Sequence, residues 1–299
     1  MSSNPLIVEV RANEFANKDM NPHVPLGAEQ LIADAADCAA AGAAVYHWHA
    51  RHTDGSDHPD DTALNARIID GIRARADLVL HATLGFIATQ GDAASRVAAI
   101  RKLVETGHAP DIIPIDVGAI ISDEWDATAH RFRSGDSAVL NHTGYLEELV
   151  EEVRDLDLPV EVVVWSPGAV RTALRLRERG LLTMPVYWQL GFTGAAIPGG
   201  APATPRQLEA FVDELPAGEP WNLHVRTGDG LALAAHAVLR GGHIAIGLGD
   251  DPYVRLGSPT NADLVTRFTH FAETIGRPVA TTAVTRELLG IDGAHQESQ

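Results

Sequence analysis

The chain has 299 residues, of which 45% are hydrophobic and 21% are charged, and its formal net charge is −17. Such a negative surface repels nucleic-acid phosphates and argues against a nucleic-acid partner. A single cysteine excludes an intrachain disulfide, and no apolar run reaches the roughly 18 residues of a membrane span, so we expect a cytoplasmic protein without a membrane partner.

Eight short apolar runs alternate with helical patterns along nearly the whole chain. Several of the helical patterns end in Gly before the next run, as helix C-caps do. Eight such units predict an α/β fold, a (β/α)₈ TIM barrel, as a single domain over residues 1–299 with a disordered tail from about 292. A doubly wound sheet is the alternative, although no G-x-G-x-x-G follows the first run. The runs are 5–12, 43–50, 77–84, 111–118, 159–166, 184–191, 221–228 and 243–250, and the helical patterns are 28–42, 65–76, 92–107, 144–156, 169–180, 204–215, 230–242 and 260–276.

Two segments after predicted strands are longer than a simple turn. Residues 121–143 form a polar excursion after the fourth run, and residues 193–205, rich in Gly, Pro and Ala, follow the sixth. Because the loops after the strands surround the active site of a TIM barrel, both are candidate mouth loops, and a loop of this kind can act as a lid.

The second run, "AAVYHWHA", places two histidines on alternate residues. Since side chains alternate along a strand, His47, His49 and Arg51 are expected on one face, and Tyr46 and Trp48 on the other. Two imidazoles about 6.5–7 Å apart along a strand can converge on one metal ion, which suits zinc. A pair of histidines hydrogen-bonded inside a polar barrel core is an equally weighted alternative.

Polar residues also accumulate toward the carboxyl ends of the other predicted strands. Glu9 and Arg11 share a face of the first strand and are expected to form a buried ion pair. A lone polar residue in a barrel is more often a core contact than a catalytic group, but their accumulation at one end predicts a site there. The residues are Glu14, His81, Thr83, Asp116, Glu161, Asn222, His224, Arg226, Asp250 and Asp251.

Three segments carry a pattern that extends over nearly the whole chain. They are "NPHVPLGAEQLIADAADCAAAGAAVYHWHARHTDG", "WNLHVRTGDGLALAAHAVLRGGHIAIGLGDD" and "PTNADLVTRF…GRPVATTAVTRELLG". With them the chain resembles the β-keto acid cleavage enzymes. The resemblance implies a zinc-dependent barrel that assembles as a homotetramer. It also implies a reaction in which a β-keto acid condenses with acetyl-CoA to give acetoacetate and a new acyl-CoA.

The resemblance implies roles for individual residues. His47 and His49 match two zinc ligands, Asp250 matches a catalytic aspartate, and Glu14 matches a substrate-binding glutamate that we also count as catalytic. Arg226 is expected to act as a catalytic cation, and Arg51 or Arg226 to hold the substrate carboxylate or the CoA phosphates. Further substrate contacts are expected at Thr83, Gly85 and Asp116.

The chain departs from the family pattern at the last strand, where it reads "GGHIAIGLGDD" and the family reads roughly G-G-H-x-R-V-G-x-E-D-N. Ala245 stands in place of the arginine, and Gly249 in place of the glutamate that is the third zinc ligand. Arg226 could restore the cation. The third ligand is left open between His224, Asp250 and Asp251, because zinc accepts both imidazole and carboxylate ligands.

Two further functions stay open at this point. One is another metal-dependent barrel hydrolase or lyase, which a binuclear metal site would favour. The other is a paralogue that binds a small acid without turning it over. Trp165, Trp188 and Phe192 near the strand ends indicate apolar contact with the substrate, with ordinary packing as the alternative.

Overall fold

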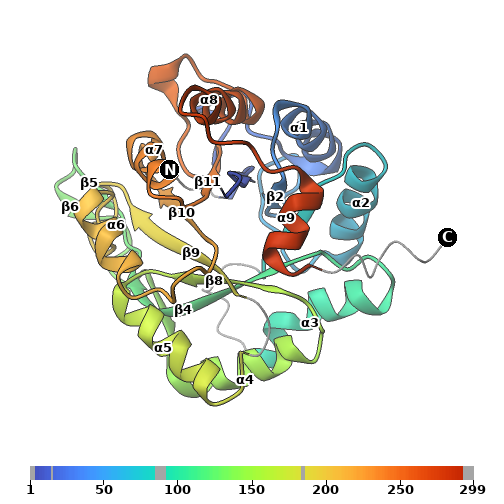
Figure 1. The fold of residues 1–299 in the computed structure, drawn as a ribbon, viewed down its shortest axis with the longest axis vertical. Helices are drawn as coiled ribbons and strands as arrows, with labels where there is room; N and C mark the ends of the chain where they lie inside the picture. The colour runs from blue at the N-terminus through green and yellow to red at the C-terminus, as the bar shows by residue number, and fades with distance from the viewer. Residues whose placement is uncertain (1–3, 15, 85–91, 183–185, 292–299) are drawn as a thin grey trace.

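The computed structural model describes residues 4–14, 16–84, 92–182 and 186–291. Within these residues eight parallel strands form the centre of the molecule, and helices surround them (Figure 1). Each strand coincides with one of the eight predicted runs, so the (β/α)₈ TIM barrel is confirmed. Residues 184–185 of the sixth run and the predicted tail from 292 lie outside the described residues. The strands are β1 (Val8–Arg11), β2 (Val45–Trp48), β3 (Val79–Ala82), β4 (Ile113–Ile121), β8 (Val160–Val164), β9 (Val186–Thr193), β10 (Trp221–Arg226) and β11 (Ile244–Ile246).

The ring is closed by hydrogen bonds between two arcs of strands. One arc has the order β11-β1-β2-β3 and the other β10-β9-β8-β4, with every pair parallel. A parallel bridge between His81 and Ile112 joins β3 to the start of β4. At the other seam the His243 amide donates to the Trp221 carbonyl, 2.7 Å away. Closure places the first and last strands side by side, with Glu9 opposite Ala245.

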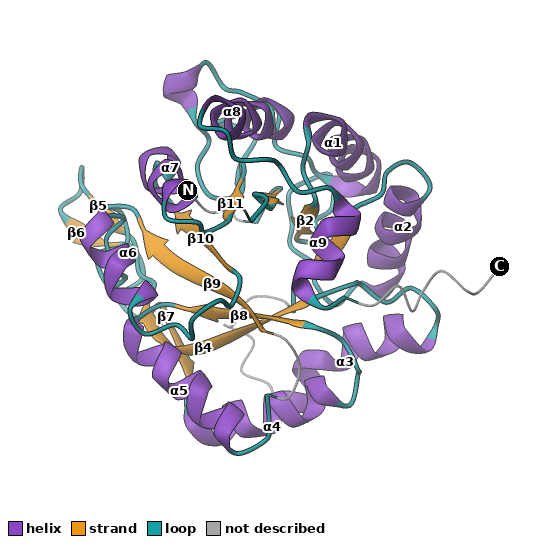
Figure 2. Ribbon diagram, viewed as in Figure 1, coloured by secondary structure: helices purple, strands orange, loops and turns teal. Residues whose placement is uncertain are grey.

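The helices form an outer layer around the strands (Figure 2). Many begin at a side chain that accepts a backbone N–H, as Asp92, Ser166 and Thr204 do, and this satisfies donors left free at a helix start. Among the described residues, no helix combines the length and the apolar character needed to cross a membrane. The helices of this layer are α1 (Gly27–Ala41), α2 (Thr62–Arg73), α3 (Ala93–Glu105), α4 (Thr143–Arg154), α5 (Pro167–Glu178), α6 (Pro205–Val212), α7 (Leu231–Leu239), the 3₁₀ helix η1 (Val254–Leu256) and α8 (Asn261–Thr274).

A further helix, α9 (Thr282–Leu289), covers the amino end of the barrel, and no helix is predicted there from the sequence. Its Leu289 joins an apolar cluster with Ile7, Val45 and Val79, which lie at or next to the first residues of the first three strands. Because this end is packed with apolar side chains, access to the barrel interior is left to the carboxyl ends of the strands.

The segment predicted as a polar mouth loop, 121–143, contains strands of its own: β5 (Trp125–Asp126), β6 (Arg131–Phe132) and β7 (Ala138–Asn141). β5 pairs with β6, and β7 turns back to pair antiparallel with the end of β4, so that Ile120 lies opposite Val139. The pairing satisfies backbone groups that a loop would leave to water. It also buries Val139 beside Val163.

The inward-facing side chains at mid-barrel form a buried polar layer. The Asn222 amide donates to Glu9 at 3.1 Å and to Glu161 at 2.7 Å, and His81 Nδ1 lies 3.0 Å from Glu9 Oε1. The Glu9–Arg11 ion pair predicted from the sequence is present, with Arg11 Nη1 3.9 Å from Glu9 Oε1. Burial raises the pKa of Glu9 to about 7, and burial together with the neighbouring Glu9 raises the pKa of Glu161 to about 8.

We expect Glu161→Gln to remove part of the alkaline loss of stability. Since the pKa of Glu161 in the folded chain lies above its ordinary value of 4.5, the folded chain keeps a proton that the unfolded chain releases, and stability falls as pH rises from about 5 to about 8. Between pH 6 and pH 9 the variant should lose less unfolding free energy than wild type, by on the order of 2 kcal/mol in urea titrations. Glu148→Gln, on the exposed side of α4, is the control. Parallel wild-type and Glu161→Gln curves would contradict the burial argument.

Candidate metal and substrate site

A cavity of about 570 Å³, a volume that includes its open mouth, lies at the carboxyl ends of the strands. Its two sides differ in chemistry. The polar side is formed by Arg11, Glu14, His47, His49, His224 and Arg226, and the facing side by Pro114, Val139, Val163 and Trp165. Thr83, Asp116 and Gln189 complete the lining. This is the position at which TIM barrels carry their active sites.

The predicted alternation along β2 is confirmed. The Tyr46 hydroxyl donates to Asp34 in α1 at 2.8 Å, and Trp48 Nε1 donates to Asn65 in α2 at 3.1 Å, so these two side chains point to the helices. His47 and His49 point into the barrel instead, with ring centroids 5.5 Å apart.

The ends of β1 and β2 are tied together by one amide side chain. Asn13 accepts from the His49 N–H at 2.9 Å and donates to the His49 carbonyl at 3.0 Å. These two bonds hold the end of β2 against the loop that carries Glu14.

Two groups of buried side chains at the cavity have the composition of a cation site. In each group the donor atoms lie within 4.8 Å of one another: Glu14 with His47 and His49, and Glu14 with His224 and Asp250. Glu14 Oε1 lies 3.4 Å from His47 Nε2, and Asp250 Oδ1 lies 3.3 Å from His224 Nδ1. Glu14 belongs to both groups.

Buried nitrogens without hydrogen bonds show that this donor set fits a cation. Neither ring nitrogen of His47 makes a hydrogen bond within the described residues, nor does His224 Nε2. Leaving such groups unsatisfied is costly, and a divalent ion would satisfy them. Burial, and next the charge of Arg11, lowers the pKa of His47 well below its usual value and also lowers that of His224. Neutral imidazole is the form that ligates metals.

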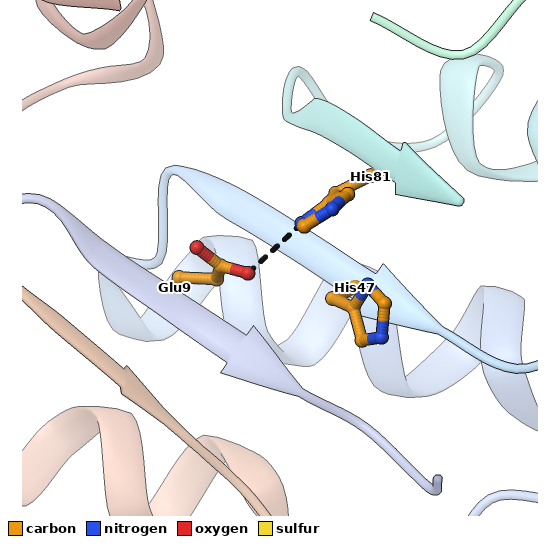
Figure 3. A group of neighbouring side chains, drawn as sticks. All are labelled: Glu9, His47 and His81. Atoms are coloured by element: carbon orange, nitrogen blue, oxygen red, sulfur yellow. Dashed lines mark hydrogen bonds and ion pairs between the residues drawn. The ribbon is translucent and has the colours of Figure 1, made fainter. Parts of the chain in front are cut away.

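A third group lies deeper in the barrel (Figure 3). Glu9, His47 and His81 extend from three neighbouring strands toward one another, and His81 Nδ1 is hydrogen-bonded to Glu9. Because both carboxylate oxygens of Glu9 already have hydrogen-bond partners, His81 and Asn222, this group is less suited to an ion than the groups at the cavity. Within this group His81 packs against His47, with ring centroids 4.5 Å apart.

Gly249, the position at which the resemblance implies a third zinc ligand, lies against the Glu14 backbone. A Cβ built at Gly249 would be 3.0 Å from the Glu14 amide nitrogen and 3.2 Å from Glu14 Cβ. The small residue therefore lets the Glu14 segment approach the last strand closely. Asp251, one of the ligands left open by the sequence, accepts from the Tyr253 N–H at 2.6 Å and does not line the cavity.

Arg11 lines the cavity, whereas the sequence predicts it only as the ion-pair partner of Glu9. Its guanidinium forms an ion pair with Glu14 and donates to Gln189 Oε1 at 3.0 Å. β1 lies next to β11, where Ala245 supplies no cation. The sequence signal was the same-face spacing of Glu9 and Arg11 with Glu14 in the loop that follows, together with the adjacency of the first and last strands in a closed barrel.

One other predicted substrate contact, Arg51, lies elsewhere in the structure. Arg51 donates to the carbonyls of Asn13, Ala16 and Gly55 at 2.6–3.0 Å and lies outside the cavity lining, so it joins two loops. Gly85 lies outside the described residues.

The remaining predicted residues divide between the cavity and the outer packing. Thr83 and Arg226 line the cavity, and Asp250 reaches it only through His224. Trp188 donates to Glu219, and Phe192 packs on Phe211 with ring centroids 5.1 Å apart; neither lines the cavity. Of the three aromatic residues expected at the substrate, Trp165 alone belongs to the described lining.

The chain is similar to known proteins in sequence and in structure. A 3-keto-5-aminohexanoate cleavage enzyme of Acetoanaerobium sticklandii is 26% identical over 278 residues, which cover 92% of this chain and 93% of that protein. A 3-oxoadipate:acetyl-CoA acetyltransferase of Cupriavidus necator is 26% identical over 297 residues, which cover 96% of this chain and 95% of that one. The solved binary complex of ObcA with oxaloacetate has a TM-score of 0.70 at 18% identity, covering 90% of this chain and 68% of that chain, and shows the same fold.

The family itself is identified by a model described as beta-keto acid cleavage enzyme, which matches residues 5–291. The match extends over all eight barrel strands and both candidate cation groups at the cavity. It confirms the resemblance drawn from the three sequence segments. The chain belongs to the beta-keto acid cleavage enzyme family.

Proposed function

We propose that the chain exchanges acyl groups between a β-keto acid and acetyl-CoA, with zinc held by His47, His49 and Glu14. The bond between C2 and C3 of the keto acid breaks, C2 joins the acetyl carbon to give acetoacetate, and the released acyl group takes the CoA thiol. The observation that carries the proposal is the buried Glu14–His47–His49 group at the mouth of a barrel of this family.

The bound ion would supply a Lewis acid for the carboxylate and keto oxygens of the substrate. The protein supplies the remaining charges. Arg11 pairs with Glu14 and lines the cavity, and Arg226 on β10 lines it as well, so a substrate carboxylate enters a cationic environment despite the net charge of the chain.

We assign removal of the C2 proton to the His224–Asp250 pair. His224 lines the cavity, its lowered pKa leaves it neutral, and its Nε2 makes no hydrogen bond within the described residues. Asp250 lies 3.3 Å from the other ring nitrogen, where it orients the ring and stabilises the imidazolium that forms. Asp250 therefore acts as a positioning residue through His224.

We expect His47→Ala to abolish stoichiometric zinc, because it removes a ligand whose two nitrogens have no other hydrogen bond in the described structure. Metal content would be measured by inductively coupled plasma mass spectrometry after dialysis. His270→Ala, an exposed histidine on α8, is the matched control and should retain the metal. Full zinc content in His47→Ala would refute the ligand assignment.

Glu14 and His224 are expected to separate metal binding from proton transfer. Glu14→Gln should weaken zinc affinity by at least about tenfold in chelator competition. His224→Asn should keep zinc and lower kcat by roughly 10²-fold, the usual scale for loss of a general base. Loss of the metal in His224→Asn would instead assign the ion to the group formed by Glu14, His224 and Asp250.

A further inference from the structure

The cavity side that faces the histidines is built from hydrocarbon. Pro114 on β4, Val139 on β7, Val163 on β8 and Trp165 just after β8 line it together; we call these four residues the apolar wall. Val139, Val163 and Trp165 are only 3%, 5% and 8% exposed and form a small core cluster of their own with Ile120. Val139 reaches this position because β7 pairs back onto β4.

The neighbours of Trp165 fix the position of its indole ring. A Cβ at Gly191 would lie 2.6 Å from Trp165 Cε3, so a side chain on that residue of β9 would displace the ring. The ring centroid lies 5.1 Å from that of His224. The apolar wall thus begins directly beside the group to which we assign the C2 proton.

Asp116 is the one carboxylate beside the apolar wall among the described residues that line the cavity, and it is already bonded. Trp165 Nε1 donates to its Oδ1 at 3.0 Å, and Arg96 Nη2 lies 3.9 Å from its Oδ2. A substrate ammonium would have to compete with these contacts. A second substrate carboxylate would meet the Asp116 charge, and burying a charge without a partner is costly.

We propose, on the basis of the function proposed above, that the β-keto acid carries an uncharged alkyl group beyond its keto carbon. The carboxylate end lies on the side of Arg11, Arg226 and the histidines, and the alkyl group lies against Val139, Val163 and Trp165. The names of the two relatives described above specify an amino group in one keto acid and a second carboxylate in the other. The apolar wall matches neither of these charged groups.

The test compares three keto acids of similar length: 3-oxohexanoate, 3-oxoadipate and 3-keto-5-aminohexanoate. Each is titrated calorimetrically into the zinc-loaded protein without acetyl-CoA, and kcat/KM for acyl exchange is measured separately. We expect 3-oxohexanoate to bind and to turn over at least about 50-fold better than either charged acid, since each buried methylene is worth roughly fourfold and an unpartnered charge opposes burial. Equal or better binding of either charged acid would overturn the proposal.

Substitutions at two adjacent valines distinguish an effect of the apolar wall on substrate preference from an effect of core packing. Val163→Thr keeps the side-chain shape but replaces a methyl group at the cavity by a hydroxyl, whereas Val164→Thr makes the same change in the main core, outside the cavity lining. We expect Val163→Thr to reduce the preference for 3-oxohexanoate over 3-oxoadipate by about fivefold or more, and Val164→Thr to leave the ratio unchanged while lowering the melting temperature. Equal ratios in the two variants would count against the wall.

The two proposals fail in different ways. If none of the acids exchanges acyl groups, the proposed function is lost, while the calorimetric order of binding still decides the class of side chain. If exchange proceeds best with 3-oxoadipate or 3-keto-5-aminohexanoate, the function stands and the inference about the apolar wall is wrong.

Discussion

The ion pairs of Arg11 connect the interior of the barrel to its mouth, and the arrangement of the site depends on them. Arg11 is 7% exposed and lies between Glu9, which is fully buried, and Glu14, which is 4% exposed. Removing one partner from such a buried network leaves an uncompensated charge and is strongly destabilising. The guanidinium, further fixed by Gln189, therefore holds Glu14 beside His47. Both the predicted cation site and the polar layer beneath it rest on this side chain.

The cavity that results is divided by charge, and the division follows from the strands that contribute to it. The side formed by β1, β2 and β10 carries the imidazoles and guanidinium groups, while β4, β7 and β8 contribute proline and valine together with the Asp116 carboxylate. A β-keto acid has the same polarity, with a carboxylate and keto group at one end and a substituent at the other. We propose that the two sides of the cavity orient such a substrate by this difference in polarity.

The barrel and the histidine pair could be predicted because both follow from the spacing of residues that are close together in the sequence. Alternation along "VYHW" separates Tyr46 and Trp48 from His47, and the structure keeps that separation. Arg51 shares the spacing of the histidines but not their place, because three carbonyl groups of neighbouring loops capture its guanidinium. Strand period alone does not report where a strand ends and a turn redirects the next side chain.

The sequence by itself determined the order of strands and helices, the inward face of β2 and membership of the family, since these depend on residues close together in the chain or on motifs that are read directly. Only the tertiary structure decided that Arg11 pairs with Glu14, that Asp250 reaches the cavity through His224, and that Val139 returns to the mouth on β7. These contacts arise from the closure of the barrel and from the antiparallel return of β7. Strand register and competition for hydrogen bonds decide which distant side chains meet. Neither produces a repeating pattern in the sequence from which the contact could be predicted.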